Sequence, residues 1–266
     1  MSPDLDTEVT VSAKFTGTST AFQQLDLHQR VREFMAHHGL KHIIALSGGA
    51  EDGLTGIDDP VLRQSLESNL AEKRKQIVRE AMERLSTYRI AVLSGGTKDG
   101  LPQTAVEEAR RVGLKTIGIF PKNGRKHALA ELDLRICVES EFDESRWGDE
   151  SSIFAKLLDG MIVYNGSAGT LIEVAHVLKI NDALLSKKKS YEKKMAADIN
   201  NELPQEKSEP LKLIVPIAGT GGVADGLPFI WAKPEVRALS TPAGQIASGA
   251  RAAQFLIDRL FLEDNI

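Results

Sequence analysis

One pattern recurs along this chain and constrains its fold more than any other: a short apolar run that ends directly on a glycine-rich turn. These turns lie at residues 47–49, 94–100, 165–170 and 218–222, and helical patterns separate the apolar runs. Strands that are apolar on both faces and alternate with helices are typical of a parallel sheet covered by helices on each side. The sequence therefore predicts an α/β, Rossmann-like three-layer fold with right-handed crossovers.

The apolar runs and helical periodicities predict where the elements lie. Strands are expected at residues 43–46, 90–93, 115–120, 134–138, 161–164 and 211–217. Helices are expected at residues 21–38, 60–87, 102–112, 149–158, 169–185 and 243–262. A weak alternation through Val9, Val11 and Phe15 indicates an edge strand or an ordered arm. We expect residues 1–40 to form an N-terminal arm and helix, and residues 41–266 a single domain with a charged insertion at about 187–210, either a surface loop or a lid.

Composition excludes several classes of function. The net charge of −4 gives no basic surface for an extended nucleic acid or an anionic membrane. Apolar runs fall far short of the roughly 20 residues that span a bilayer, and the N-terminus lacks the basic region of a signal peptide. We expect a soluble, cytoplasmic protein. The single cysteine, Cys137, lies in an apolar run and indicates a buried residue, and neither a metal site nor a resident cofactor is expected.

The glycine-rich turns are the candidate ligand site. The carboxyl ends of parallel strands lie on one edge of the sheet, so the four turns are expected to converge there. Glycines let backbone N–H groups approach a ligand, and a helix N-terminus attracts phosphate. The candidate ligand-binding residues are Ser47, Gly48, Gly49, Gly95, Gly96, Thr97, Asp99, Gly166, Ser167, Gly169, Thr170, Gly219, Gly221 and Gly222. Ordinary turn chemistry is the alternative interpretation of these residues.

Residues 163–173 form the most informative of these turns, because an apolar strand leads through glycines into a helix that carries Glu173 in its first turns. A carboxylate suits the positive end of the helix dipole, but beside a phosphate it would rather meet ribose hydroxyls or take part in a proton transfer. None of the turns matches a P-loop or a dinucleotide fingerprint, and the spacing around Ser167 is wrong for a serine hydrolase.

Two of the turns resemble motifs of a known group. Residues 93–102, Leu-Ser-Gly-Gly-Thr-Lys-Asp-Gly-Leu-Pro, resemble the first glycine motif of the SLOG superfamily, Rossmann-like proteins related to the LONELY GUY (LOG), or lysine decarboxylase-like, family. Residues 166–173, Gly-Ser-Ala-Gly-Thr-Leu-Ile-Glu, resemble the Pro-Gly-Gly-x-Gly-Thr-x-x-Glu motif of that family. The resemblance covers about residues 41–260.

For LOG-like proteins the resemblance implies hydrolysis of the N-glycosidic bond of a nucleoside 5′-monophosphate. It assigns Glu173 to the ribose and the chemistry, and Gly166, Gly169 and Thr170 to the phosphate. It also implies a homodimer. A nearby carboxylate would stabilise the oxocarbenium-like ribosyl transition state, and the held phosphate would provide positioning.

The sequence departs from the family motif at three places. Asn165 replaces the motif proline and Ser167 its second glycine, while Asp149 and Glu150 occupy the region where an arginine is expected. Arg146 is the nearest candidate for the catalytic arginine. We therefore predict that the protein binds a nucleotide or an ADP-ribose-like ligand, with phosphoribohydrolase activity as the alternative and a molybdenum-cofactor carrier, whose cargo is an anionic pterin phosphate, as the second alternative.

Four further side chains carry two interpretations each. Lys122 and Arg125 follow the predicted strand at 115–120 and would either bind a second phosphate or remain surface charges. Trp147 and Trp231 would either stack on a base or pack within the protein.

Overall fold

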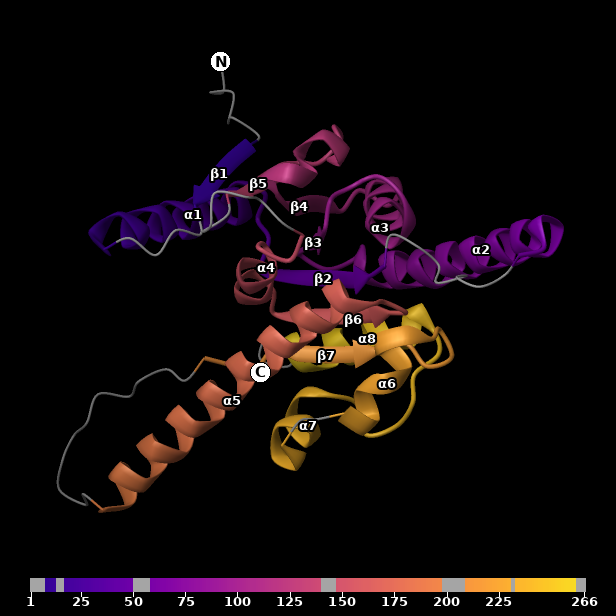
Figure 1. Ribbon diagram of the computed structural model, residues 1–266. Coiled ribbons are helices and arrows are strands. Elements are labelled where there is room, and N and C mark those ends of the chain that lie inside the picture. Colours follow the sequence, from indigo (N-terminus) through magenta and orange to yellow (C-terminus); the bar gives the residue numbers. More distant parts are fainter. Residues whose placement is uncertain are drawn as a thin grey trace.

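The structure is a computed structural model that describes residues 8–12, 17–49, 58–139, 147–197, 209–230 and 233–261. Its centre is one seven-stranded sheet in which every neighbouring pair is parallel (Figure 1). The strands are β1 (Glu8–Ser12), β2 (His42–Gly48), β3 (Ile90–Ser94), β4 (Lys115–Pro121), β5 (Leu134–Glu139), β6 (Gly160–Tyr164) and β7 (Leu213–Pro216). Their order across the sheet is β1-β5-β4-β3-β2-β6-β7.

Helices cover both faces of this sheet (Figure 1). One apolar core joins it to α1 (Gly17–His37), α4 (Ser151–Leu157), α5 (Ala168–Ala197) and α6 (Gly222–Ile230). The other joins it to α2 (Pro60–Leu85), α3 (Gly100–Arg111) and α8 (Gly249–Leu260). A short α7 (Pro234–Ser240) and a 3-10 helix, η1 (Lys122–His127), complete the described elements. The predicted three-layer α/β fold is confirmed.

The alternation of side chains along each strand explains the two cores. Ile44 and Ala45 are adjacent on β2 and fully buried, yet they belong to opposite cores because successive side chains point to opposite faces. The central strands therefore carry apolar side chains on both faces, which is the pattern from which the parallel sheet was predicted.

The strand order places a topological switch point between β2 and β6. From β2 the chain adds β3, β4 and β5 on one side, and then crosses back to place β6 against the other side of β2. In open α/β sheets the ligand crevice lies outside the carboxyl ends of the strands at such a point. The turns after β2 and β6, at residues 47–49 and 165–170, lie there.

The predicted boundaries differ from the structure mainly at the C-terminal end. The helix predicted from residue 243 begins at Gly249, because Ile246 forms a bridge with Ile217 and the Ser248 hydroxyl accepts a bond from the Arg251 N–H at 3.5 Å. Helices α6 and α7 were not predicted. Gly226, Pro228 and Pro234 are residues typical of turns, so the sequence of this region predicts loops rather than helices.

The structure also tests the predictions for the charged insertion and for the N-terminal alternation. Helix α5 continues to Ala197, through the first part of the predicted insertion, and residues 198–208 lie outside the described part of the chain. The alternation around Val9 is an edge strand, because β1 pairs with β5 over its whole length.

Candidate functional site

The residues at the switch point are joined by one side-chain contact. The Ser47 hydroxyl, at the end of β2, donates a hydrogen bond to the carboxylate of Glu173 on α5. Ser47 is 2% exposed, so its only polar side-chain atom is committed to this partner. The contact brings the turn after β2 and the turn after β6 together, as the predicted convergence requires.

The N-terminus of α5 is the open part of this edge. Ser167, Ala168 and Gly169 are exposed, and a Cβ atom added at Gly169 would have no other atom within 4 Å. The Ser167 carbonyl accepts the N–H of Leu171, which makes Ser167 the residue that precedes the helix. The N–H groups of a helix's first turn have no partner inside the helix, so those of residues 168–170 are positioned to meet an anion.

Two other residues of this turn support the loop from within. Thr170 is buried, and a Cβ at Gly166 (φ +99°) would lie 2.5 Å from its side chain. Asn165 takes φ +50°, and its N–H donates to the Thr220 hydroxyl at 2.9 Å. Proline cannot adopt that φ or make that bond, so the departure from the family motif at Asn165 has a local physical reason.

Burial changes the protonation of two carboxyl groups near the switch point. It raises the pKa of Glu173 to about 8, against the opposing effect of the Ser47 hydrogen bond, and the negative charge of Glu150 raises it further. Glu173 as a residue is only partly buried, and its carboxylate accepts the hydrogen bond of the buried Ser47 hydroxyl. Burial likewise raises the pKa of Glu150 to about 7, although its carboxylate accepts the Gly148 N–H at 2.9 Å.

Glu150 was not singled out as a site residue from the sequence. It precedes α4, which packs against α5, and it is 9% exposed. No local sequence pattern around Glu150 predicts that its side chain is buried near Glu173. Two carboxyl groups with raised pKa values, one on α5 and one at the start of the packed α4, are the chemical core of the candidate site.

The turn after β3 is mostly packed against its neighbours in the fold. Gly96 (φ +63°) lies against β4, where an added Cβ would come within 2.6 Å of the Gly118 Cα atom. Thr97 is buried and forms an antiparallel bridge with Ala128. These contacts fix the turn against residues 127–129.

Asp99 and Gly95 remain accessible in the same turn. Asp99 is exposed and adopts φ 76° and ψ 153°, a conformation normal only for glycine, while its N–H donates to the Gln103 side chain at 2.7 Å. Gly95 is partly buried, and an added Cβ would make only ordinary contacts with Pro102.

Gly48 and Gly49 have packing roles at the end of β2. An added Cβ at Gly48 would overlap the Tyr164 carbonyl oxygen and the Leu101 side chain. The Gly49 carbonyl accepts the N–H of Leu101, in the first turn of α3, at 3.1 Å. Both glycines therefore hold the turn after β2 against its neighbours.

The turn after β7 is filled by its own chain. The N–H groups of Gly219 and Gly221 each donate to the Asp225 carboxylate at 2.7 Å. At Gly222 (φ +55°) an added Cβ would overlap the carbonyl oxygen of Gly166. An internal carboxylate thus occupies the position that the sequence suggested for a ligand anion.

The remaining predicted residues have different outcomes. Arg146 and Trp231 lie outside the described residues. Lys122 pairs with Glu139 at 3.0 Å and Arg125 with Glu8 at 2.7 Å, which favours their interpretation as surface charges. Trp147 is 57% exposed, and a Cβ added at Gly124 would lie 2.8 Å from its ring.

Two negative findings concern only the described part of the chain. No group of three or more His, Cys, Asp or Glu side chains is placed there to hold a metal ion. None of its helices combines the length and the apolarity that crossing a bilayer requires.

Comparison with known proteins adds a family and a fold. Residues 66–214, more than half of the 266-residue chain, match the model of the SLOG cluster4 family. No curated protein matches the sequence significantly. The molybdenum cofactor carrier protein of Chlamydomonas reinhardtii is similar in structure, with a TM-score of 0.51, 18% identity and coverage of 84% of this chain and 99% of that one. The structural genomics target TM1055 is similar too, with a TM-score of 0.50, 18% identity and coverage of 81% and 98%. At 18% identity, the likeness of each of these structures to this chain shows a shared fold.

Proposed function

The chain belongs to the SLOG cluster4 family, and from this premise we propose that it binds a nucleotide or a nucleotide-derived ligand by its phosphate at the switch point between β2 and β6. One observation carries the proposal: the exposed first turn of α5 lies beside the partly buried Ser47–Glu173 hydrogen bond. The helix N-terminus offers N–H groups and a positive dipole end to the phosphate.

The raised pKa of Glu173 removes the conflict between a carboxylate and a phosphate. With a pKa of about 8, the group is mostly protonated at neutral pH and does not repel an anion at the first turn of α5. A protonated carboxyl group both donates and accepts hydrogen bonds, which suits a ribose hydroxyl. Residues 169 and 173 are about one helical turn apart and lie on the same face of α5. The phosphate and the ribose of one ligand could therefore contact α5 on that face.

Hydrolysis of the N-glycosidic bond is the second candidate, and the Glu150–Glu173 pair favours it. Cleavage requires a proton for the departing base and negative charge to stabilise the ribosyl cation. Two coupled carboxyl groups, with pKa values of about 7 and 8, provide one protonated and one ionised member near neutral pH. A molybdenum-cofactor cargo would present the same kind of phosphate to α5 and remains an alternative ligand.

Ligand screening combined with product analysis separates these functions. Isothermal titration with AMP, ADP-ribose and inorganic phosphate should show one saturable site for at least one nucleotide. If the protein is a hydrolase, chromatography after incubation with AMP should detect free adenine, and Glu173→Gln should abolish its release. Binding without adenine release would sink the hydrolase candidate, and no binding of any of the three, nor of molybdenum cofactor, would sink the proposal itself.

A further inference from the structure

An exposed tryptophan lies at the same edge of the sheet as the proposed phosphate site. Trp147 precedes α4, and more than half of its side chain is in contact with water. Its indole ring is nevertheless held along one edge. A Cβ atom added at Gly124 would lie 2.8 Å from the ring atom Cη2 and 3.1 Å from Cζ3, so this edge rests on the backbone of η1, which follows the carboxyl end of β4. A ring that is anchored at one edge and exposed elsewhere is suited to stack on a flat ligand.

Hydrogen bonds fix the turn that carries this tryptophan. The Gly148 N–H donates to the Glu150 carboxylate at 2.9 Å, and the Gly148 carbonyl accepts the Ser151 N–H at 3.1 Å. Helix α4, which begins at Ser151, packs against α5. The backbone next to Trp147 is therefore tied to the elements that carry the Glu150–Glu173 pair.

The same turn meets α5 at Ile172. A Cβ atom added at Gly148 would lie 3.7 Å from the Ile172 Cδ1 atom, an ordinary van der Waals distance. Ile172 is 40% exposed, and it follows Ala168 by four positions and Gly169 by three, so the three residues share one face of α5. Trp147 and Ile172 thus provide exposed apolar surface that borders the exposed first turn of α5.

We propose that Trp147 and Ile172 bind the heterocyclic base of the nucleotide whose phosphate meets the first turn of α5. This inference rests on the proposed function and adds two specificity-determining side chains to it. The flat faces of a base stack well on an aromatic ring, whereas the phosphate requires the N–H groups of the helix. Phosphate at residues 168–170, ribose at Glu173 and base beside Ile172 place the three parts of one ligand along the start of α5. The protein therefore prefers a nucleotide to a sugar phosphate.

The size of this surface favours a base over a second protein chain. Even with the exposed Leu171 beside them, Trp147 and Ile172 offer far less than the roughly 800 Å² that each partner buries in a stable interface. One flat ring needs only the face of one aromatic side chain and a neighbouring aliphatic contact. A small ligand held at the adjacent phosphate turn meets both requirements.

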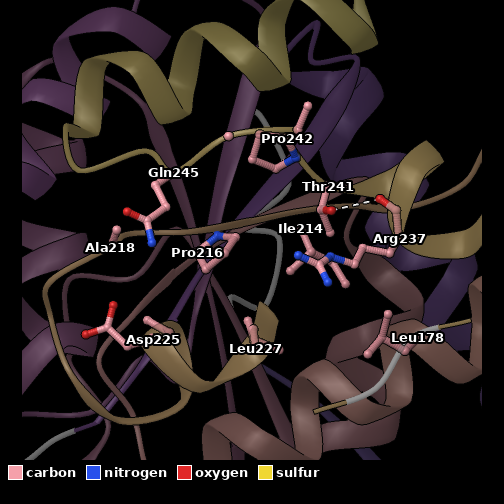
Figure 2. Close-up of a pocket in the computed structure, with 13 residues that line it drawn as sticks. Leu178, Ile214, Pro216, Ala218, Asp225, Leu227, Arg237, Thr241, Pro242 and Gln245 are labelled. Atoms are coloured by element: carbon pink, nitrogen blue, oxygen red, sulfur yellow. Dashed lines mark hydrogen bonds between the residues drawn. The ribbon is translucent and has the colours of Figure 1, made fainter. Parts of the chain in front are cut away.

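Helix α7, at the β7 edge of the sheet, supplies a matched control. It borders a separate cavity of about 390 Å³, which also involves β7 and α6 (Figure 2). Its Leu239 is 43% exposed and similar in size to Ile172. The Lys189–Glu235 ion pair joins α7 to α5 at a point about 30 Å along α5 from Gly169. Leu239→Ala therefore removes a similar exposed side chain far from the proposed base site.

Isothermal titration with AMP and with ribose 5-phosphate, which lacks the base, tests the inference. The wild-type protein should bind AMP at least fivefold more tightly than ribose 5-phosphate. Trp147→Ala should lower the affinity for AMP to that for ribose 5-phosphate and leave the affinity for ribose 5-phosphate unchanged. Trp147→Phe, which keeps a flat ring, should retain most of the preference. Ile172→Ala should weaken AMP binding by a smaller factor, and Leu239→Ala should not change it.

Tryptophan fluorescence gives a second reading of the same contact. The chain has two tryptophans, so Trp231→Phe leaves Trp147 as the only source of tryptophan emission. AMP should quench the emission of this variant because its base stacks on the indole ring, whereas ribose 5-phosphate should leave the emission unchanged. Rapid mixing records the change before any ligand is hydrolysed.

The results distinguish failure of the base site from failure of the proposed function. Equal wild-type affinities for AMP and ribose 5-phosphate, or a preference for AMP that survives in Trp147→Ala, would overturn the base site and leave the phosphate site standing. An equal loss of both ligands in Trp147→Ala would show that the tryptophan only supports the fold. If the wild-type protein binds neither ligand, the base site is overturned, and the wider nucleotide screen then decides the proposed function.

Discussion

The turns after β6 and β7 have similar glycine-rich sequences and opposite structural characters. At the start of α5, Ser167 and Gly169 are exposed to open space. In the turn after β7, the N–H groups of Gly219 and Gly221 already hold the Asp225 carboxylate. Glycine content therefore identifies a turn that can bind an anion, and the neighbouring side chains decide whether the anion is a ligand or part of the protein.

The filled turn also supports the open one. The Thr220 hydroxyl accepts the Asn165 N–H, and the first N–H groups of α6 donate to the carbonyls of Asn165 and Gly166. The two turns are thus joined by hydrogen bonds, with residues 219–222 as the supporting turn and residues 167–170 as the proposed contact surface.

The largest expected difference between the two turns is in their tolerance of a methyl group. Gly222→Ala should lower the free energy of unfolding by about 3 kcal/mol or more, because its Cβ overlaps the Gly166 carbonyl and its φ is +55°. Gly169→Ala should leave stability unchanged or raise it by up to about 1 kcal/mol, since the site is open and alanine favours a helix. Urea denaturation measures both, and equal stabilities would remove the distinction between scaffold and open turn.

Removing the Asp225 carboxylate should leave the N–H groups of the turn after β7 without their internal anion, as at the start of α5. Asp225→Ala should lower stability by about 2 kcal/mol, because two charge-assisted hydrogen bonds are lost. Asp258→Ala on α8, whose exposed side chain accepts only from Gln254 in the described structure, should change stability by less than about 0.5 kcal/mol.

Sulfate extends this comparison. Added sulfate should raise the melting temperature of Asp225→Ala more than that of Asp258→Ala, since the anion can occupy the emptied turn and stabilise the folded state by mass action. A sulfate response that is identical in the two variants would show that the Gly219 and Gly221 N–H groups do not form an anion cradle.

A smaller effect, on the order of 1 kcal/mol after allowance for partial exposure, is expected from the pKa of Glu173. The folded-state pKa, about 8, lies above the value of an unfolded glutamate. This contribution to stability is therefore complete below about pH 4.5 and is lost as the pH rises through about 8. The wild-type protein should lose stability relative to Glu173→Gln between about pH 4.5 and pH 8, with no further loss at higher pH. A difference that stays constant or grows in favour of the wild type contradicts the assigned burial.

Much of the fold was predictable because the signals are local. Apolar runs, glycine turns and helical spacing predicted the central strands and the layers, and they correctly brought the turns to one edge. The order of the strands was not predictable from local signals, since it depends on how the crossover from β5 to β6 returns to β2.

The site was predictable only in outline. Glu173 stood out because a carboxylate is unusual beside a phosphate cradle, but its partner Ser47 comes from a strand 126 positions away. Asp225 follows Gly219 by six positions, and only the folded turn reveals that its carboxylate returns to the glycine N–H groups. Glu150 acquires its role through burial, which no local pattern marks.

The most direct test of the central claim is the affinity of AMP, or of the tightest-binding nucleotide in the screen, for Gly169→Asp. The control is Gly244→Asp, which also introduces a carboxylate at an exposed glycine with open space around it, but outside the first turn of α5. We predict at least a tenfold loss of affinity in Gly169→Asp and wild-type affinity in Gly244→Asp by isothermal titration, because the new carboxylate repels the phosphate at the helix N-terminus. Wild-type affinity in Gly169→Asp would contradict the assignment of the first turn of α5 as the phosphate site.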